Sequence, residues 1–212
     1  LKYGIGSILG WYCIYQIKSD EMLGIMNTVI GTASVPLMLL APLLAKKLGK
    51  RNVLIWTNLI RAAFCVVMLF TMNNTIVFFV CLYLATLTLG GDSVITTSMT
   101  AEIFDYQQWK TGKRLEGFWQ NCNAFVMTLC GLFTSALMPL FMSFGGVGFG
   151  DNIDTALKNP DIMYGTFKSV TWLGIIASVI CVIPIIFYDL SEKKHADYIR
   201  ALKIRAVVEN YK

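Results

Sequence analysis

Residues Val170–Tyr188 read VTWLGIIASVICVIPIIFY, an uninterrupted apolar stretch without a charged side chain. An α-helix of this length, rising about 1.5 Å per residue, extends for about 30 Å. That distance matches the hydrocarbon core of a bilayer, and a helix satisfies its backbone polar groups without water. The stretch therefore predicts a membrane-spanning helix.

Five further apolar stretches have the same character. Of the 212 residues, 56% are hydrophobic and only 15% are charged, whereas soluble domains carry about 25% charged residues. The stretches are too uniformly apolar for barrel strands, which alternate. The sequence therefore predicts an all-α integral membrane protein, with a bundle of six transmembrane helices in residues 1–190. The predicted spans are Leu1–Ile17, Met22–Ala45, Val53–Met72, Thr75–Ala101, Phe118–Phe144 and Val170–Tyr188.

Lysine and arginine are concentrated in alternate connections, which predicts the orientation of the bundle. Cytoplasmic loops retain basic residues, so a multi-pass protein of the cell membrane with a cytoplasmic C-terminus is expected. The net charge of +5 follows from these loops, and it is not a sign of nucleic-acid binding. The regions predicted to be cytoplasmic hold Lys46, Lys47, Lys50 and Arg51, then Lys110, Lys113 and Arg114, and finally Lys193, Lys194, Arg200, Lys203, Arg205 and Lys212.

Residues 191–212 differ from the spans. Ala196, Ile199, Leu202 and Ala206 recur at helical spacing among charged residues. This spacing predicts an amphipathic helix on the cytoplasmic surface. A solvated tail is the alternative.

The cysteines and the single histidine argue against catalysis, metal binding or a cofactor. All six cysteines lie within apolar spans without a C-x-x-C pair, which favours a packing role. His195 lies outside the spans, and no nucleophile–base pattern is present. We therefore expect neither an enzyme nor a metal site. The cysteines are Cys13, Cys65, Cys81, Cys122, Cys130 and Cys181.

Helix-disrupting residues occur inside four of the spans. Proline and adjacent glycines kink helices, and transporters tolerate such kinks where a cavity or neighbouring helix satisfies the freed backbone groups. Ordinary packing irregularity is the alternative. These residues are Pro36, Pro42, Gly90, Gly91, Pro139 and Pro184.

Two ionisable residues lie within predicted spans, where a charge is costly and often functional. Arg61 is in the middle of the third span, and Asp92 lies in the fourth among glycine, serine and threonine residues. Asp92 could bind a sugar hydroxyl, a proton or Na⁺. It could equally form a buried structural pair with Arg61.

The fifth span begins with an aromatic and amide cluster that suits a sugar. Trp119 and Asn123 are four residues apart and Gln120 and Asn123 three, so part of the cluster shares one helix face. An aromatic ring covers the C–H surface of a sugar while amides bind its hydroxyls. The cluster could alternatively join helices. Thr128 in the same span and Tyr12 in the first complete the predicted substrate-binding residues.

Ala101–Gly117, AEIFDYQQWKTGKRLEG, places opposite charges together in a predicted short cytoplasmic loop. Such charges can form ion pairs that exchange as one side of a transporter opens. The predicted gating residues are Asp105, Lys110, Lys113, Arg114 and Glu116. Simple topological anchoring by the basic residues is the alternative.

This stretch resembles the loop before the penultimate helix of the glycoside–pentoside–hexuronide (GPH):cation symporter family, the family of the melibiose carrier. Pro42–Arg51 and Phe187–His195 are similar to two further parts of that family. The resemblance implies helices seven to twelve of a major facilitator fold, its C-terminal half. It also implies sugar symport against an N-terminal half not present here, where the Na⁺ or H⁺ site mainly lies.

Two positions depart from the family pattern. Gln108 replaces a frequent acidic residue, and Thr128 replaces a frequent lysine. The resemblance therefore does not specify the sugar. Two other functions stay open: a symporter for lysolipid or another solute, and a non-transporting membrane sensor or scaffold. The expected partners are a small solute, the lipid bilayer and the N-terminal half.

Overall fold

The computed structural model describes residues 20–72, 74–112, 116–148, 150–188 and 192–210. Five of its helices are long and apolar enough to cross a membrane, and the predicted first span, Leu1–Ile17, lies outside the described residues. The short helix α6 (Ile153–Ala156) precedes the last of the five, and α8 (Glu192–Asn210) follows it. The five are α2 (Asp20–Leu48), α3 (Lys50–Thr71), α4 (Thr75–Thr111), α5 (Glu116–Phe144) and α7 (Pro160–Ile186).

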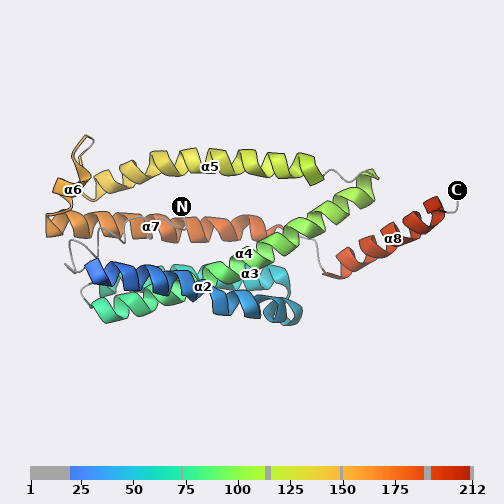
Figure 1. Ribbon diagram of the computed structural model, residues 1–212, viewed down its shortest axis with the longest axis horizontal. Helices are drawn as coiled ribbons and strands as arrows, with labels where there is room; N and C mark the ends of the chain where they lie inside the picture. Colours follow the sequence, from blue (N-terminus) through green and yellow to red (C-terminus); the bar gives the residue numbers. More distant parts are fainter. Residues whose placement is uncertain (1–19, 73, 113–115, 149, 189–191, 211–212) are drawn as a thin grey trace.

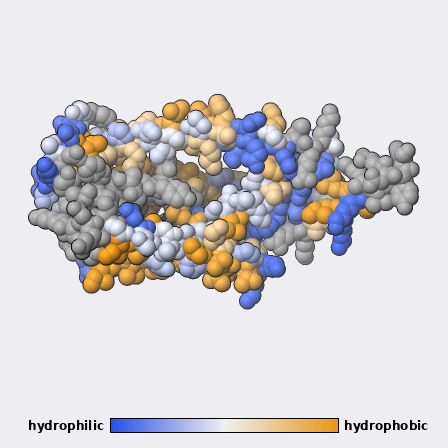
Figure 2. Space-filling view, in the orientation of Figure 1, coloured by the Kyte–Doolittle hydropathy of each residue, from blue (hydrophilic) through white to orange (hydrophobic). Residues whose placement is uncertain are grey.

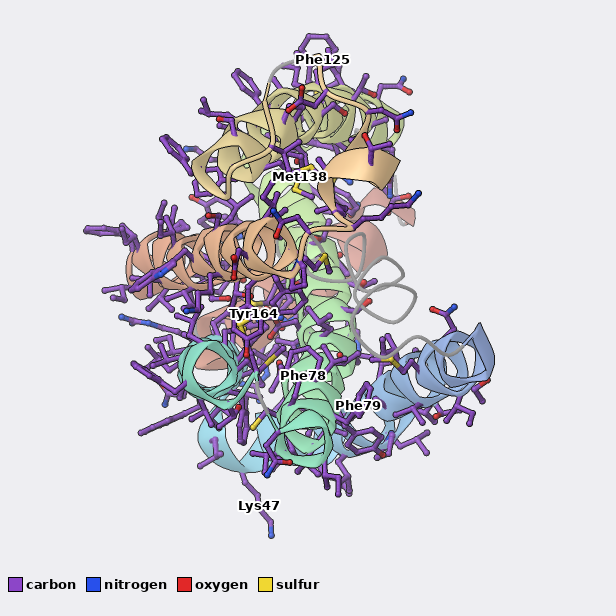
Figure 3. The ribbon with its side chains drawn as sticks, turned by 90° about the vertical axis from the view of Figure 1, so that its left-hand side faces the viewer. Lys47, Phe78, Phe79, Phe125, Met138 and Tyr164 are labelled. Carbon is purple, nitrogen blue, oxygen red and sulfur yellow. The ribbon has the colours of Figure 1, made fainter. Side chains whose placement is uncertain are left out.

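The long helices form a packed group with one helix beside it. Helix α4 packs against both α2 and α3, and α3 also packs against α7. Helix α5 runs along the other side of α7 (Figure 1). The end-on view in Figure 3 places α5 and α3 at opposite ends of the molecule. Beyond the bundle, α8 lies beside the far end of α4.

Two apolar clusters hold the packed group together. The larger one includes Phe78 of α4 and Phe167 of α7, whose rings meet edge to face with centroids 5.3 Å apart. The second joins Ala41, Leu54 and Ile95, one each from α2, α3 and α4. Helices in lipid associate mainly through close packing, so these clusters fix the relative positions of the four helices.

The outer faces of the helices are apolar. Leu39 is 73% exposed, Phe70 82% and Phe133 68%. Figure 2 shows hydrophobic residues along the helices, with hydrophilic residues gathered toward their ends. Lipid chains solvate such a surface as well as a protein interior would. The surface is that of a multi-pass membrane protein.

Helices α2 and α4 approach closely at the two adjacent glycines of α4. A Cβ atom on Gly90 would overlap the carbonyl oxygen of Ser34, and one on Gly91 would lie 2.9 Å from the side chain of Leu37. Helix α4 continues through both glycines. The two glycines thus allow close packing of α2 on α4, and α2, α5 and α7 likewise continue through their internal prolines.

The prediction of a loop at Ala101–Gly117 is wrong for most of that stretch, which belongs to helix α4. The helix continues through Thr111, and Gly112 ends it in the left-handed region at φ 70°, where its N–H donates to the Gln108 carbonyl. Polar residues end the apolar stretch but do not end a helix, because the capping residue does that. The charged motif is thus mostly helical, and Glu116 already begins α5.

The start of α7 also differs from the prediction. The helix begins at Pro160 instead of Val170, and the Asn159 side chain caps it by accepting the Asp161 N–H at 3.1 Å. Asparagine followed by proline is a strong helix start. A search for uninterrupted apolar residues misses it, because Lys168 lies within the helix.

The described cysteines are free thiols. Cys65 and Cys81 are buried in the larger apolar cluster, as a packing role predicts. Cys130 is exposed on α5. The cause is that α5 buries none of its residues. Cys13 lies outside the described residues.

Candidate functional site

An ion pair between Arg61 of α3 and Asp92 of α4 lies inside the packed group. The Arg61 Nη2 atom is 2.7 Å from Asp92 Oδ2, and the two side chains are 3% and 11% exposed. This is the pairing that the sequence left open as the structural alternative. An unpaired charge here would be strongly unfavourable, so each residue stabilises the other.

Polar neighbours complete the surroundings of this pair. Arg61 donates from Nη2 to Asn58 Oδ1 at 2.6 Å and from Nε to Ser178 Oγ of α7 at 3.2 Å. Thr57 donates to Asp92 Oδ1. Thr57, Asn58 and Arg61 share one face of α3 because they are three and four residues apart. The cluster therefore joins α3, α4 and α7 through hydrogen bonds.

One guanidinium nitrogen of Arg61 differs from the others. Within the part of the chain that the structure describes, the buried Arg61 Nη1 has no hydrogen-bond partner. Buried donors are usually satisfied. The cluster thus retains one unused donor, and Arg61 Nη1 can donate a hydrogen bond to a further oxygen atom.

A second polar cluster centres on Glu102 near the end of α4. Glu102 is 4% exposed and forms an ion pair with Lys50 at the start of α3. Tyr188, just after α7, donates to Glu102 Oε2 at 3.3 Å. His195 of α8 approaches Glu102 at 3.8 Å and Asp105 at 3.0 Å. This network connects α3, α4, the end of α7, and α8.

Burial, reinforced by the nearby Glu102 carboxylate, raises the pKa of the Tyr188 phenol well above its ordinary value. Tyr188 therefore stays neutral and remains a hydrogen-bond donor at physiological pH. Beside it, Arg51 donates to the Ile186 carbonyl at 2.6 Å. Together these contacts tie the start of α3 to the end of α7.

Aromatic rings attach α8 to the extension of α4. The Tyr198 ring lies 4.6 Å from Trp109 and 5.3 Å from Tyr106, measured between centroids. Offset and tilted aromatic pairs of this kind contribute about 0.5–1.5 kcal/mol beyond area burial. The rings explain why the tail helix lies against α4, while its cytoplasmic location stays a prediction.

The predicted solute-binding residues of α5 are all exposed. Trp119 is 41% exposed, and Gln120, Asn123 and Thr128 are exposed as well. Asp92 faces α3 instead, so the structure places these predicted substrate-binding residues in two separate surroundings. Tyr12 lies outside the described residues.

Of the predicted gating residues that the structure describes, Asp105 lies within the Glu102 network, through His195. Lys110 is exposed near the end of α4, and Glu116 is half-buried at the start of α5. Lys113 and Arg114 lie outside the described residues. Sequence reasoning missed Glu102 itself, although its three-residue spacing from Asp105 could have indicated a shared helix face.

Three curated relatives resemble the chain at low identity. It is 24% identical to the uncharacterized symporter YnaJ of Bacillus subtilis over 96% of this chain and 44% of that protein. It is 24% identical to the uncharacterized symporter YjmB of the same organism, covering 94% and 43% respectively. The glucuronide carrier protein homolog of Escherichia coli is 23% identical, covering 93% and 42%. The chain thus spans less than half the length of these relatives.

No solved structure gives a significant match. Residues 3–192 match the family described as MFS/sugar transport protein. This is a family of transporters and not of enzymes, and its multi-pass helical character agrees with the five long apolar helices. The chain belongs to the MFS/sugar transport protein family.

Proposed function

We propose that the chain is the C-terminal half of a sugar:cation symporter of the GPH type. Its helices would bind a glycoside-like solute against an N-terminal half and release it when the two halves rock. Support comes from the family and from relatives named symporters. One relative is named a glucuronide carrier protein homolog. The coupling ion would be Na⁺ or H⁺, held mainly by the other half.

The exposed amides near the start of α5 are the observation that carries this proposal. Helix α5 has membrane-spanning length, yet none of its residues is buried in the described structure. The exposed amides Gln120, Asn121 and Asn123 would be unsatisfied in hydrocarbon. A wet pathway or a protein neighbour would satisfy them. A solute pathway beside these amides would provide the former.

The α5 residues would divide the work of binding. Trp119 would cover the C–H face of a sugar ring, while Gln120 and Asn123 bind its hydroxyl groups. Thr128 and Tyr12 would add further contacts. Asp92 would contribute through its pair with Arg61, whose free Nη1 donor can bind a solute oxygen that reaches the cluster.

Gating is proposed for the charged motif and the network beside it. Ion pairs that join helix ends can hold one conformation and release it in another. Asp105 would act through His195, and Lys110, Lys113, Arg114 and Glu116 would act around the α4–α5 turn. The Lys50–Glu102 pair joins α3 to α4 and would keep these two helix ends together while the proposed gate opens and closes.

Solute uptake tests the proposal directly. In proteoliposomes of the complete transporter, Asn123→Ala should reduce uptake of a labelled glucuronide or glycoside about fivefold, since one hydrogen bond contributes about 1 kcal/mol. Uptake should also require an inward Na⁺ or H⁺ gradient. Phe133→Leu, an apolar change on the same exposed helix, is the matched control and should leave uptake unchanged.

Equal uptake by wild type and Asn123→Ala at equal protein content would contradict the role of α5. Absence of uptake for every glycoside, pentoside and hexuronide tested would contradict the solute class. Uptake that is indifferent to both ion gradients would contradict symport.

A further inference from the structure

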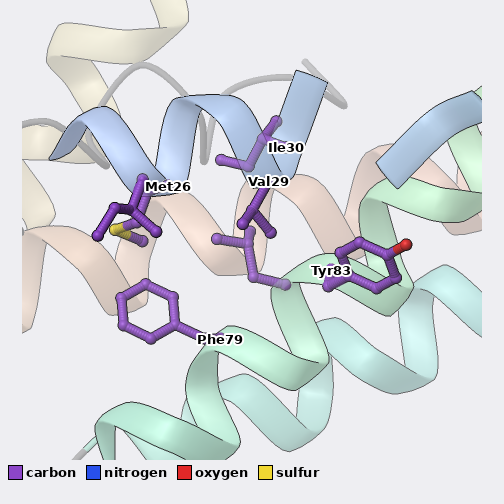
Figure 4. A pocket seen from close by; sticks show the side chains of 7 residues that line it. Met26, Val29, Ile30, Phe79 and Tyr83 are labelled. Atoms are coloured by element: carbon purple, nitrogen blue, oxygen red, sulfur yellow. The ribbon is translucent and has the colours of Figure 1, made fainter. Parts of the chain in front are cut away.

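The contact between α2 and α4 is tight in the middle and open on either side. Gly90 against Ser34, and Gly91 against Leu37, bring the helices together. On one side of this contact lies a cavity of about 220 Å³ with apolar walls and the Tyr83 ring (Figure 4). On the other side, toward the end of α2, lies a groove of about 320 Å³.

The groove has one apolar part and one cationic part. Small residues of α2 leave it open, because Ala41, Pro42 and Ala45 face α4 without long side chains. Val94 and Ile95 form the apolar wall of α4. The polar lining groups are Ser98, Lys46 and Lys50.

The two lysines of the groove differ in their partners. Lys50 is bound to Glu102. Lys46 is exposed, and across the described ranges no carboxylate pairs with it. Lys46 is therefore available to an anion from outside the chain. The cavity on the other side of the tight contact has no cation in its lining.

The outer side of α2 next to the groove is apolar and exposed. Leu39 is 73% exposed one turn before Pro42, and Leu43 is 58% exposed one turn before Lys46. An occupant of the groove therefore contacts apolar side chains of α2 and α4 and a lysine ammonium group. The matching chemistry is amphiphilic and anionic.

We propose that this groove binds an anionic phospholipid from the leaflet next to the α2–α3 turn. An acyl chain would lie against Ala41, Ala45 and Ile95, with the phosphate at the Lys46 ammonium. Basic residues gather at this turn, which the positive-inside rule places at the leaflet that carries anionic lipids. Basic pockets between membrane helices are suited to such headgroups. Lipid binding at this site would not depend on which solute the protein transports.

Lipid titration of the purified full-length protein in a non-ionic detergent tests the site. Native mass spectrometry would follow binding of phosphatidylglycerol and of phosphatidylcholine with identical chains. Wild type should prefer phosphatidylglycerol, and Lys46→Gln should weaken its binding about fivefold, as expected for one basic residue at an anionic surface. Lys47→Gln is the matched control, because Lys47 is an adjacent exposed lysine outside the groove lining.

Filling the groove provides a second variant. Ser98→Leu should also weaken phosphatidylglycerol binding while keeping the melting temperature near that of wild type. Glycerol phosphate, which carries the phosphate without acyl chains, should not displace the lipid at equal concentration. Equal weakening by Lys46→Gln and Lys47→Gln, or displacement by glycerol phosphate, would overturn the proposal. Equal binding of the two phospholipids by wild type would do the same.

Discussion

The interior of α3, α4 and α7 and the surface of α5 hold the same kinds of polar side chain in opposite surroundings. Asn58 is 1% exposed and accepts a hydrogen bond from Arg61, whereas Asn123 is exposed on α5. Both lie in helices of membrane-spanning length. A polar residue in an apolar helix can thus serve packing or transport, and its neighbours decide which role applies.

The largest difference in stability is expected for changes to the Arg61–Asp92 ion pair. Arg61→Met or Asp92→Asn alone should destabilise the protein by about 3–5 kcal/mol, because each leaves a buried group without its partner. Combining Arg61→Met with Asp92→Leu should restore most of that loss. Unfolding in detergent, followed by tryptophan fluorescence, measures both effects.

If Asp92→Asn kept wild-type stability while transport changed, Asp92 would instead belong to the solute pathway. If stability and transport were both unchanged, neither role would hold.

The two regions should also respond differently to a methyl group on glycine. Gly90→Ala should destabilise by about 3 kcal/mol, near the upper end for overpacking, because backbone of α2 obstructs the new Cβ. Gly131→Ala on α5 is the control, since nothing lies within 4 Å of the added atom. There a gain of up to about 1 kcal/mol is expected from helix propensity. Similar melting temperatures for both variants would contradict the difference in packing.

The same substitution, asparagine to alanine, can be made at Asn58 in the packed interior and at Asn123 on α5, so that only the surroundings differ. Asn58→Ala should cost about 2 kcal/mol, because an acceptor of Arg61 is lost inside the packed group. Asn123→Ala should change stability by less than about 0.5 kcal/mol and act on solute uptake instead. Parallel unfolding and uptake assays separate the effects. A stability loss of equal size at both positions would mean that α5 is packed like α3.

At the Glu102 network we expect a smaller loss of stability than at Asn58. Tyr188→Phe should destabilise by about 0.5–1.5 kcal/mol through loss of one hydrogen bond. Since the pKa of Tyr188 is raised in the folded state, the stability it contributes is complete below the ordinary tyrosine value of about 10 and falls at more alkaline pH. Melting curves at neutral and alkaline pH measure this. Tyr188→Phe should flatten the alkaline decline, and an unchanged decline would rule out Tyr188 as its source.

Much of the membrane architecture could be predicted from local sequence, but the helix limits could not. Hydropathy marks where apolar residues stop, while α4 continues for one polar segment beyond Ala101 until Gly112 caps it. The same difference moved the start of α7 to Pro160. Capping residues, and not hydropathy, determine the ends of these helices.

The candidate site was only partly predictable for a related reason. The sequence indicated Arg61 and Asp92 because charges are rare in apolar spans. Glu102 was missed because it lies in a polar segment where one more carboxylate is unremarkable. Its importance depends on Lys50, Tyr188 and His195, which approach it only in the fold.

The sequence by itself determined that this is a multi-pass helical membrane protein, because the length and apolarity of each span are local properties set by bilayer thickness. Only the tertiary structure decided which polar groups meet. Arg61 is separated from Asp92 by 31 positions and from Ser178 by 117, yet it bonds to both. Packing of α3 between α4 and α7 creates these contacts, whereas α5 remains open. Pairing inside lipid depends on which helix faces oppose one another, and that geometry follows from close packing across the whole chain.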